Sequence, residues 1–374
     1  MKLGIALAGL LLSATTAQAA GTDCPLAHQP YSSRTILADV LGDPAAKAVL
    51  DREAPELVSG FSRNFGGRPL PPGFARILSL ESLLRTRPNG AALASRLDTA
   101  LGAVKLTPQA IRARCAGYDQ TPPGLPANIK RPAILVFDKI TGFRDAPSVN
   151  AATAALKAMA ARRGWTIVFS DNGAVFNARD LARFDAVVWN NVSGDALTVR
   201  QEQALKSWLA HGGGFAGFHG SGGDPLYVWD WYADTLIGAR FIGHPMSPQF
   251  QAARVIVEDS GSAITRGLGP GWTMTEEWYS FAASPRSKGA HILARLDESS
   301  YSPLGIGGQD LRMGDHPIAW TQCIGNGRSF YSAIGHRPEN YSEPNSLKLL
   351  ENGIAWAAGL GETRCLAGKE SGTR

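Results

Sequence analysis

The pattern of hydrophobic and polar positions changes about a third of the way along the 374-residue chain. In the first part, apolar side chains recur at helical spacing and extended apolar runs are scarce. Pro44, which follows a capping Asp43, and Pro108 each suit the first turn of a helix. We therefore predict a small all-α module over residues 20–118 and a proline-rich linker over 119–132.

From residue 133 onward, short apolar runs alternate with helical stretches. Four rounds of strand and helix predict an α/β domain with a parallel sheet and helices on both faces. Functional sites in such sheets lie beyond the carboxyl ends of the strands. The runs that we interpret as strands are 133–138, 165–170, 185–191 and 214–219.

Beyond residue 240 the pattern indicates further strands joined by turns. Asn326-Gly327 predicts a hairpin between the last two of them. A closing helix over 344–359 is expected to bury Leu347, Leu350, Ile354 and Ala357. We place the α/β domain at 133–360 and a C-terminal tail at 361–374.

The first residues resemble a signal peptide, which we place at 1–19. Lys2 precedes an apolar stretch, and Ala17-Gln18-Ala19 is a small-x-small cleavage signal. No other segment is long and apolar enough for a membrane anchor. We expect a periplasmic or secreted protein.

Composition and charge limit the classes of partner that the protein is expected to bind. The net charge is +5, but Lys and Arg form no run longer than two, which favours a solvated surface over a nucleic-acid site. Four cysteines in an oxidising compartment allow two disulfides in three pairings. A disulfide between Cys24 and Cys115 would cross-link the N-terminal region, and one between Cys323 and Cys365 would cross-link the C-terminal end. Spacing alone leaves the pairing open.

Four histidines lie where strands end or turns begin: His219, His244, His316 and His336. Each could be a structural, hydrogen-bonded histidine, but their common position favours a site. Glu276 and Glu277 add two carboxylates beside Trp278 and Tyr279.

The residues from 133 to about 359 resemble the ThuA-like family, which is named for trehalose utilisation. The matching phrases, in family order, are GFRDAPSV, DAVVWNNVSGDALT, HGGGFAGFHG, GHP, TEEWYSF, LDES, DHPIAW and GHRPENY. The resemblance implies a class I glutamine amidotransferase-like fold, with a flavodoxin-like sheet and additional C-terminal strands. It also implies a small-molecule carbohydrate as the partner.

Glutamine amidotransferases of this fold carry a Gly-x-Cys-x-Gly elbow and a later His-x-Glu pair. Here His219 occupies the place of the cysteine, and His336 with Glu339 echoes the pair at wider spacing. An imidazole cannot form the thioester of glutaminase chemistry, so we expect none. Ser221 lies two residues past the corner, which disfavours a serine nucleophile.

Two chemical roles for the histidines stay open. In one, His219, Glu277 and His336 perform acid–base catalysis on a sugar or keto-sugar, by isomerisation, elimination or hydrolysis. In the other, histidines and a carboxylate bind a divalent metal such as zinc or manganese. The candidate metal ligands are His219, His244, His316 and His336. The candidate substrate-binding residues are Lys139, Arg144, Asp224, Trp278 and His316.

The alternative to an enzyme is a non-catalytic carbohydrate-binding or scaffold protein, built on an amidotransferase-like fold that has lost its nucleophile.

Overall fold

The structure, a computed structural model, describes residues 23–64, 72–85, 87–361 and 365. The predicted signal peptide and most of the predicted tail lie outside these residues. Within them, no helix is both long and apolar enough to cross a membrane.

The first part of the described chain is helical, as its periodicity predicts. The Asp43 carboxylate accepts hydrogen bonds from the backbone N–H groups of Ala45 and Ala46 and so caps α2. Ser79 and Ser82 form a reciprocal capping box at α5. The helices are α1 (Leu37–Gly42), α2 (Pro44–Glu53), α3 (Pro55–Asn64), α4 (Pro72–Ile77), α5 (Leu80–Leu84), α6 (Gly90–Gly102) and α7 (Pro108–Cys115).

The second part is a nine-stranded mixed sheet in the order β2-β1-β3-β4-β11-β10-β9-β6-β7. The first five strands in this order are parallel and the remaining pairs are antiparallel. The strands are β1 (Ala133–Phe137), β2 (Thr166–Ser170), β3 (Ala186–Asn190), β4 (Gly214–Phe218), β6 (Gln251–Val257), β7 (Gly271–Glu276), β9 (His291–Leu296), β10 (Pro317–Ile324) and β11 (Gly327–Ser332). A separate pair joins β5 (Phe241–Gly243) to β8 (Ser280–Phe281).

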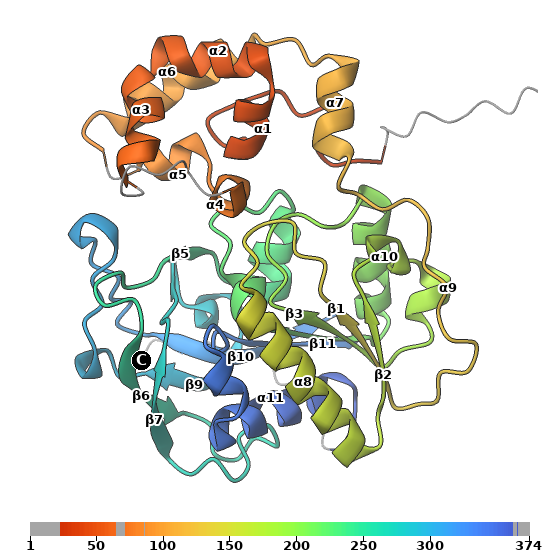
Figure 1. Cartoon of the computed structure of the whole chain (residues 1–374). Coiled ribbons are helices and arrows are strands. Elements are labelled where there is room, and N and C mark those ends of the chain that lie inside the picture. The colour runs from red at the N-terminus through yellow and green to blue at the C-terminus, as the bar shows by residue number, and fades with distance from the viewer. Residues whose placement is uncertain (1–22, 65–71, 86, 362–364, 366–374) are drawn as a thin grey trace, which may run out of the picture.

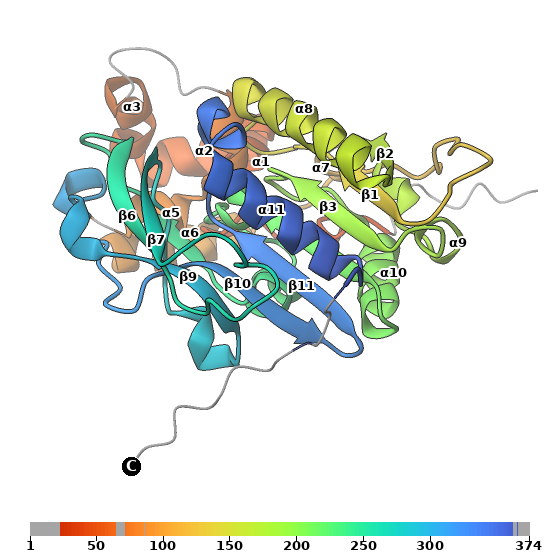
Figure 2. The ribbon, with the colours of Figure 1, turned by 90° about the horizontal axis from the view of Figure 1, so that it is seen from below.

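Helices cover both faces of this sheet. Figure 2 shows α8 and α11 side by side on one face, and α10 packs on the other, as right-handed crossovers require. The helices are α8 (Ala146–Arg163), α9 (Ala178–Leu181), α10 (Val199–Ala210) and α11 (Pro344–Ala357). The short helical turns are η1 (Gly173–Val175), η2 (His219–Gly222), η3 (Tyr232–Ile237), η4 (Pro285–Lys288), η5 (Glu298–Ser300), η6 (Ile306–Gly308) and η7 (Pro338–Tyr341).

Two local predictions shift by one or two residues. The hairpin between β10 and β11 turns at Gly325-Asn326, because Ile324 pairs with Gly327 and Gly325 supplies the positive φ of 61°. In α11, Leu349 is fully buried where Leu347 was expected to be, and Leu347 is half-buried.

Both disulfides join the partners that would staple the ends of the chain, Cys24 with Cys115 and Cys323 with Cys365. The helical module sits against one end of the α/β domain (Figure 1). Its α4 contacts the loop after β1, where the rings of Phe74 and Phe143 are 5.1 Å apart. The module therefore lies at the carboxyl ends of the parallel strands, where a site is expected.

Candidate functional site

His219 is the first residue after β4. The five residues of β4 are all buried, and the chain then turns sharply, with a φ of +41° at His219. A left-handed conformation is uncommon for a residue other than glycine, and it is the backbone geometry of a strand-to-helix elbow. His219 is buried, and its imidazole stacks on the ring of Tyr279, with 4.1 Å between ring centres.

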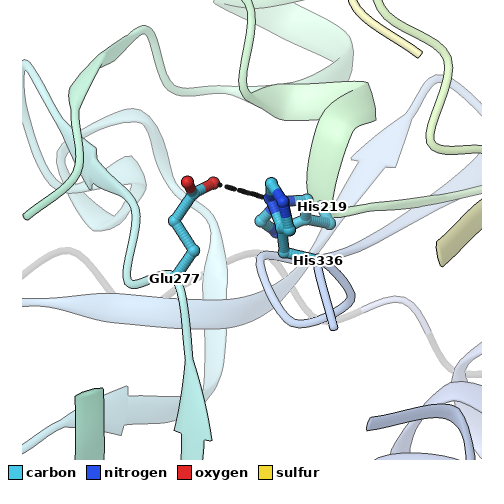
Figure 3. A group of neighbouring side chains, drawn as sticks. All are labelled: His219, Glu277 and His336. Carbon is cyan, nitrogen blue, oxygen red and sulfur yellow. Dashed lines mark hydrogen bonds and ion pairs between the residues drawn. The ribbon is translucent and has the colours of Figure 1, made fainter. Parts of the chain in front are cut away.

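Three side chains from three separate segments converge at this corner (Figure 3). His219 Nε2 lies 3.0 Å from His336 Nδ1, and that nitrogen lies 2.9 Å from Glu277 Oε2. His219 Nε2 is 3.4 Å from the same carboxylate oxygen. The structure thus brings together all three residues that the sequence suggested for acid–base chemistry.

The hydrogen bonds assign the protons. His219 Nδ1 lies 2.9 Å from the carbonyl oxygen of Ala333, which can only accept, so this nitrogen carries a proton. In the neutral ring Nε2 is then an acceptor, and His336 Nδ1–H donates towards it and towards Glu277. Burial lowers the pKa of His336, but its bond to Glu277 outweighs this effect and the pKa is raised. Burial raises the pKa of Glu277, but its close contacts with the imidazoles of His219 and His336 hold it well below the usual value.

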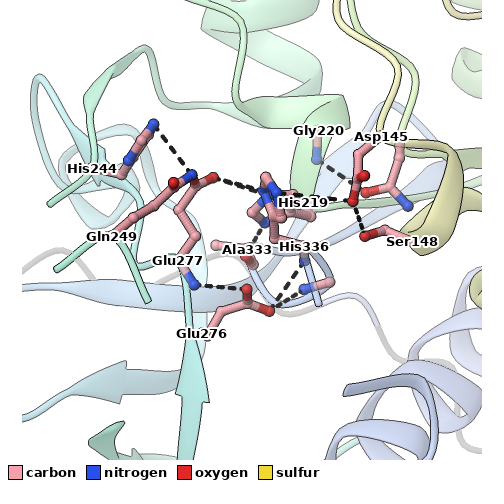
Figure 4. A network of polar contacts seen from close by, with 12 residues as sticks. Asp145, Ser148, His219, Gly220, His244, Gln249, Glu276, Glu277, Ala333 and His336 are labelled. Atoms are coloured by element: carbon pink, nitrogen blue, oxygen red, sulfur yellow. Dashed lines mark hydrogen bonds and ion pairs between the residues drawn. The ribbon is translucent and has the colours of Figure 1, made fainter. Parts of the chain in front are cut away.

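His336 is the outward-facing member of the group. Its side chain is 17% exposed, against 4% for His219 and 3% for Glu277. With Nδ1 held inside, Nε2 points outward and lies 3.8 Å from Asp145 Oδ2 (Figure 4). Asp145 precedes α8 and accepts a hydrogen bond from Ser148. The ring of His336 is therefore placed between two carboxylates.

The other oxygen of Glu277 faces a different loop. His244 Nε2 lies 3.3 Å from Glu277 Oε1, and the amide of Gln249 donates a hydrogen bond to the same oxygen (Figure 4). His244 is therefore a neighbour of the site through Glu277.

Glu276 fixes the backbone that carries His336. It is fully buried, and its carboxylate accepts hydrogen bonds from the N–H groups of Gly335 at 2.7 Å and His336 at 3.2 Å and from the amide of Asn340. Burial raises its pKa. Glu276 acts on the site by positioning the loop after β11.

Glu339 and Ser221, which the comparison with the glutamine amidotransferase elbow brought up, lie outside the group of His219, Glu277 and His336. Glu339 is 67% exposed and pairs with Arg337, so Glu277 supplies the carboxylate next to His336 instead. The Ser221 hydroxyl is fully buried, donates to the carbonyl of Trp189 at 2.9 Å and accepts from Val192 N–H. All four cysteines are in disulfides.

Two candidate ligands have structural roles. His316 is fully buried, with Nδ1 on Glu298 at 2.8 Å and Nε2 on the carbonyl of Tyr279 at 2.8 Å, so both ring nitrogens are occupied. Trp278 is 1% exposed and donates to the carbonyl of Gln251, which leaves no ring face for a sugar. The expectation that these two residues bind substrate or metal is therefore corrected.

The remaining substrate candidates lie around the strand ends. Asp224 is buried, accepts from the N–H groups of Gly194 and Leu226, and has its pKa raised to about 7 by burial. Lys139 is paired with Asp119. Arg144 is exposed, next to Asp145 on the loop after β1. The Arg144 guanidinium donates to the carbonyl of Asp138 at 3.5 Å.

The donor set also fits a metal. Nitrogen atoms of His219 and His336 and an oxygen of Glu277 lie within 4.8 Å of one another. Two imidazoles and a carboxylate suit zinc or manganese, and the bond from His219 Nδ1 to Ala333 is the outer contact that orients a ligating histidine. His244 faces the outer oxygen of Glu277 and His316 is outside the group.

Sequence reasoning missed Asp145, Gln249 and the positioning role of Glu276. Asp145 follows the first strand of the parallel sheet, so the rule that sites form at strand ends could have included it. Gln249 belongs to an irregular loop, and no local pattern marks it.

A family model described as "ThuA: Trehalose utilisation" matches residues 133–357. A ThuA-like protein from Bacteroides uniformis of known structure is 24% identical, with a TM-score of 0.53, over 65% of this chain and 98% of that one. Another from Parabacteroides merdae is 14% identical, with a TM-score of 0.46, over 64% and 98%. No curated protein matches. The likeness in structure concerns the fold, and the family model spans more than half of the sequence: the chain belongs to the ThuA family.

Proposed function

We propose that this protein is an acid–base catalyst that acts on a keto-sugar, with His336 as the acid and Asp145 as the base. The observation that carries the proposal is the placement of the outward His336 Nε2 beside the Asp145 carboxylate, while Glu277 holds Nδ1 inside. Membership of a family named for trehalose utilisation supports a carbohydrate as substrate.

The chemistry follows from the charges. The imidazolium of His336 donates a hydrogen bond to the ketone oxygen, and Asp145 accepts the proton from the adjacent carbon. The electron pair of that C–H bond forms an enediolate, whose negative charge the imidazolium stabilises. For isomerisation, His336 protonates the former ketone oxygen and then takes the proton of the hydroxyl on the adjacent carbon. Asp145 returns its proton to the former ketone carbon, so the carbonyl moves by one carbon. Departure of a β-glycosidic oxygen, protonated by His336, eliminates the aglycone.

His219 and Glu277 prepare His336 for this role. The buried carboxylate favours the charged imidazole, and His219 Nε2 accepts from the same Nδ1–H. A proton lost from His336 Nε2 therefore leaves a ring whose orientation is fixed from within.

Hydrogen exchange tests the proposal directly. We expect a keto-glycoside to exchange the hydrogen next to its ketone for deuterium in heavy water, observed by proton NMR. Asp145→Asn and His336→Gln should each slow this exchange by about 10²–10⁴-fold. His211→Ala is the matched control, because His211 is exposed and bonds only within its own helix end. Saturable sugar binding without exchange or turnover would favour the carbohydrate-binding alternative.

A second candidate is metal-assisted chemistry on the same substrates, favoured by the convergence of His219, Glu277 and His336. A bound divalent cation would polarise a carbonyl or an adjacent hydroxyl. Elemental analysis of the purified protein should then find zinc or manganese near one equivalent, lost in His219→Ala and kept in His316→Asn. A metal content far below one equivalent in the wild type contradicts this candidate.

We also propose that the protein is exported. The leader-like residues 1–19 and the two disulfides support an oxidising compartment. Amino-terminal sequencing of the periplasmic or secreted protein should begin at Ala20. A full-length cytoplasmic chain contradicts export.

A further inference from the structure

Exposed large apolar side chains gather on one side of the site. The structure gives five of them among the described residues: Val199, Met246, Phe250, Leu304 and Ile306. Four belong to two loops, 244–250 and 302–308, and the fifth lies at the start of α10. We call Met246, Phe250, Leu304 and Ile306 the apolar rim.

The two loops of the apolar rim are joined to each other. Met246 N–H donates to the carbonyl of Leu304 at 3.2 Å, and Gln251 exchanges hydrogen bonds with the backbone of Ser302. The rim is therefore one surface and not a set of isolated side chains.

The apolar rim is continuous with the catalytic group. The ring of Phe250 meets that of His336 at 5.1 Å between centres, in an edge-to-face arrangement. On the same loop, His244 and Gln249 contact Glu277 Oε1. A ligand on His336 therefore lies beside Phe250 and can extend over Met246 towards Leu304 and Ile306.

The exposure of these side chains is costly in water. Leu304 is 49% and Ile306 68% exposed, and both sit on a loop rich in glycine. Apolar surface next to a site gains free energy when a ligand covers it. Free sugars offer mainly hydroxyl groups, and an alkyl or aryl aglycone offers the matching surface.

We infer that the substrate is a glycoside with an apolar aglycone, which the apolar rim binds while the sugar faces His336 and Asp145. This inference rests on the proposed function and names its substrate class. It predicts that affinity depends on the length of the aglycone at a constant sugar.

A matched series of methyl, butyl and hexyl keto-glucosides tests it by titration calorimetry. We expect affinity to rise at least about tenfold from methyl to hexyl, since each of the added methylenes contributes up to about fourfold when it is fully buried. The double variant Leu304→Ser/Ile306→Ser should reduce the ratio of the hexyl affinity to the methyl affinity to about one and leave the affinity for the methyl compound unchanged. Val199→Ser, on the remaining exposed apolar residue, should leave the ratio as in the wild type.

The outcomes separate the two proposals. A ratio near one in the wild type, no binding of the hexyl member, or a ratio that survives the double variant overturns the inference. Concentration-dependent self-association that the double variant abolishes, with a ratio near one, assigns the rim to a second copy and also overturns it. If the ratio behaves as expected but no compound exchanges its hydrogens, the acid–base proposal fails and the aglycone site stands.

Discussion

His336 and Glu277 form the central pair of the site, with 2.9 Å between the imidazole Nδ1 and the carboxylate Oε2, although the two residues come from strands that are not neighbours. β11, before His336, lies in the middle of the sheet, and β7, before Glu277, forms its edge. The pair fixes the ring of His336 so that its other nitrogen faces outward. An imidazole held in this way has a fixed orientation, and its charged form is favoured.

This pair predicts the direction in which His336 titrates. Glu277 raises the pKa of His336, so the imidazolium should persist above the ordinary value of about 6.5. In Glu277→Gln the charge is lost while burial remains, and the pKa should fall below that of the wild type. Nitrogen-15 NMR of the imidazole measures both values. Because the pKa of His336 is higher in the folded state, its contribution to the free energy of unfolding is fully present below pH about 6.5. This contribution is lost as pH rises through the raised pKa. Equal titration of His336 in both proteins would remove the proposed role of Glu277.

Glu276 should act as a positioning residue. The carboxylate of Glu276 accepts hydrogen bonds from Gly335, His336 and Asn340. In Glu276→Gln the uncharged amide has one carbonyl oxygen, and its other end is an N–H₂ group that cannot accept. We expect the free energy of unfolding to fall by about 1–3 kcal/mol. We also expect kcat to fall with little change in KM, and the pH profile to shift with the displaced His336. Glu339→Gln, an exposed change on the same loop, is the control for urea denaturation and kinetics. A loss of stability with an unchanged pH profile would assign Glu276 a structural role only.

Gly335 allows the close approach of the His336 loop to His219. Its φ is +142°, and a Cβ there would come within 2.4 Å of the Tyr341 hydroxyl and 3.2 Å of His219 Cβ. Gly335→Ala should therefore lower stability by roughly 1–3 kcal/mol for the strained backbone and displace both histidines. Gly314→Ala is the matched control, because Gly314 also has a positive φ but meets nothing within 4 Å. Thermal unfolding and the NMR signals of the histidines measure the difference. Equal effects of the two variants would show that the close contact is unimportant.

A buried acid in the first turn of α10 predicts a second pH effect. Burial, with a contribution from Asp195, raises the pKa of Glu202 to about 8. The folded state then holds a proton that the unfolded state, with a pKa near 4.3, has released, so stability should fall as pH rises from about 4.3 to about 8. Glu202→Gln should reduce the difference between pH 5 and pH 8 in chemical denaturation. An unchanged difference in this variant would show that other groups set the pH dependence.

Much of the fold was predictable because local rules determine it. The continuous apolar run at 133–137 became a strand buried at every position, and Asp43 caps α2 as its position before a proline suggested. The hairpin between β10 and β11 was predicted, although its turn lies one residue earlier than the Asn-Gly pair.

The site was predictable only in part. Strand ends and glycine turns mark His219 and His336, because parallel strands end at one edge of the sheet. Glu277 was expected to act with both histidines, but no local pattern showed that it, and not Glu339 three residues after His336, meets the His336 ring. It also could not separate His316, whose two ring nitrogens are used inside the protein, from the histidines of the site.

The sequence by itself therefore determined the elements, their order and the elbow at His219, since these depend on periodicity, caps and glycine positions along the chain. Only the tertiary structure decided which carboxylate each histidine meets and which ring nitrogen faces outward. The physical reason is that hydrogen bonds and charges act through space. The course of the chain after β7, which no local pattern encodes, brings the Glu277 carboxylate to 2.9 Å from His336 Nδ1, although β7 is the edge strand of the sheet.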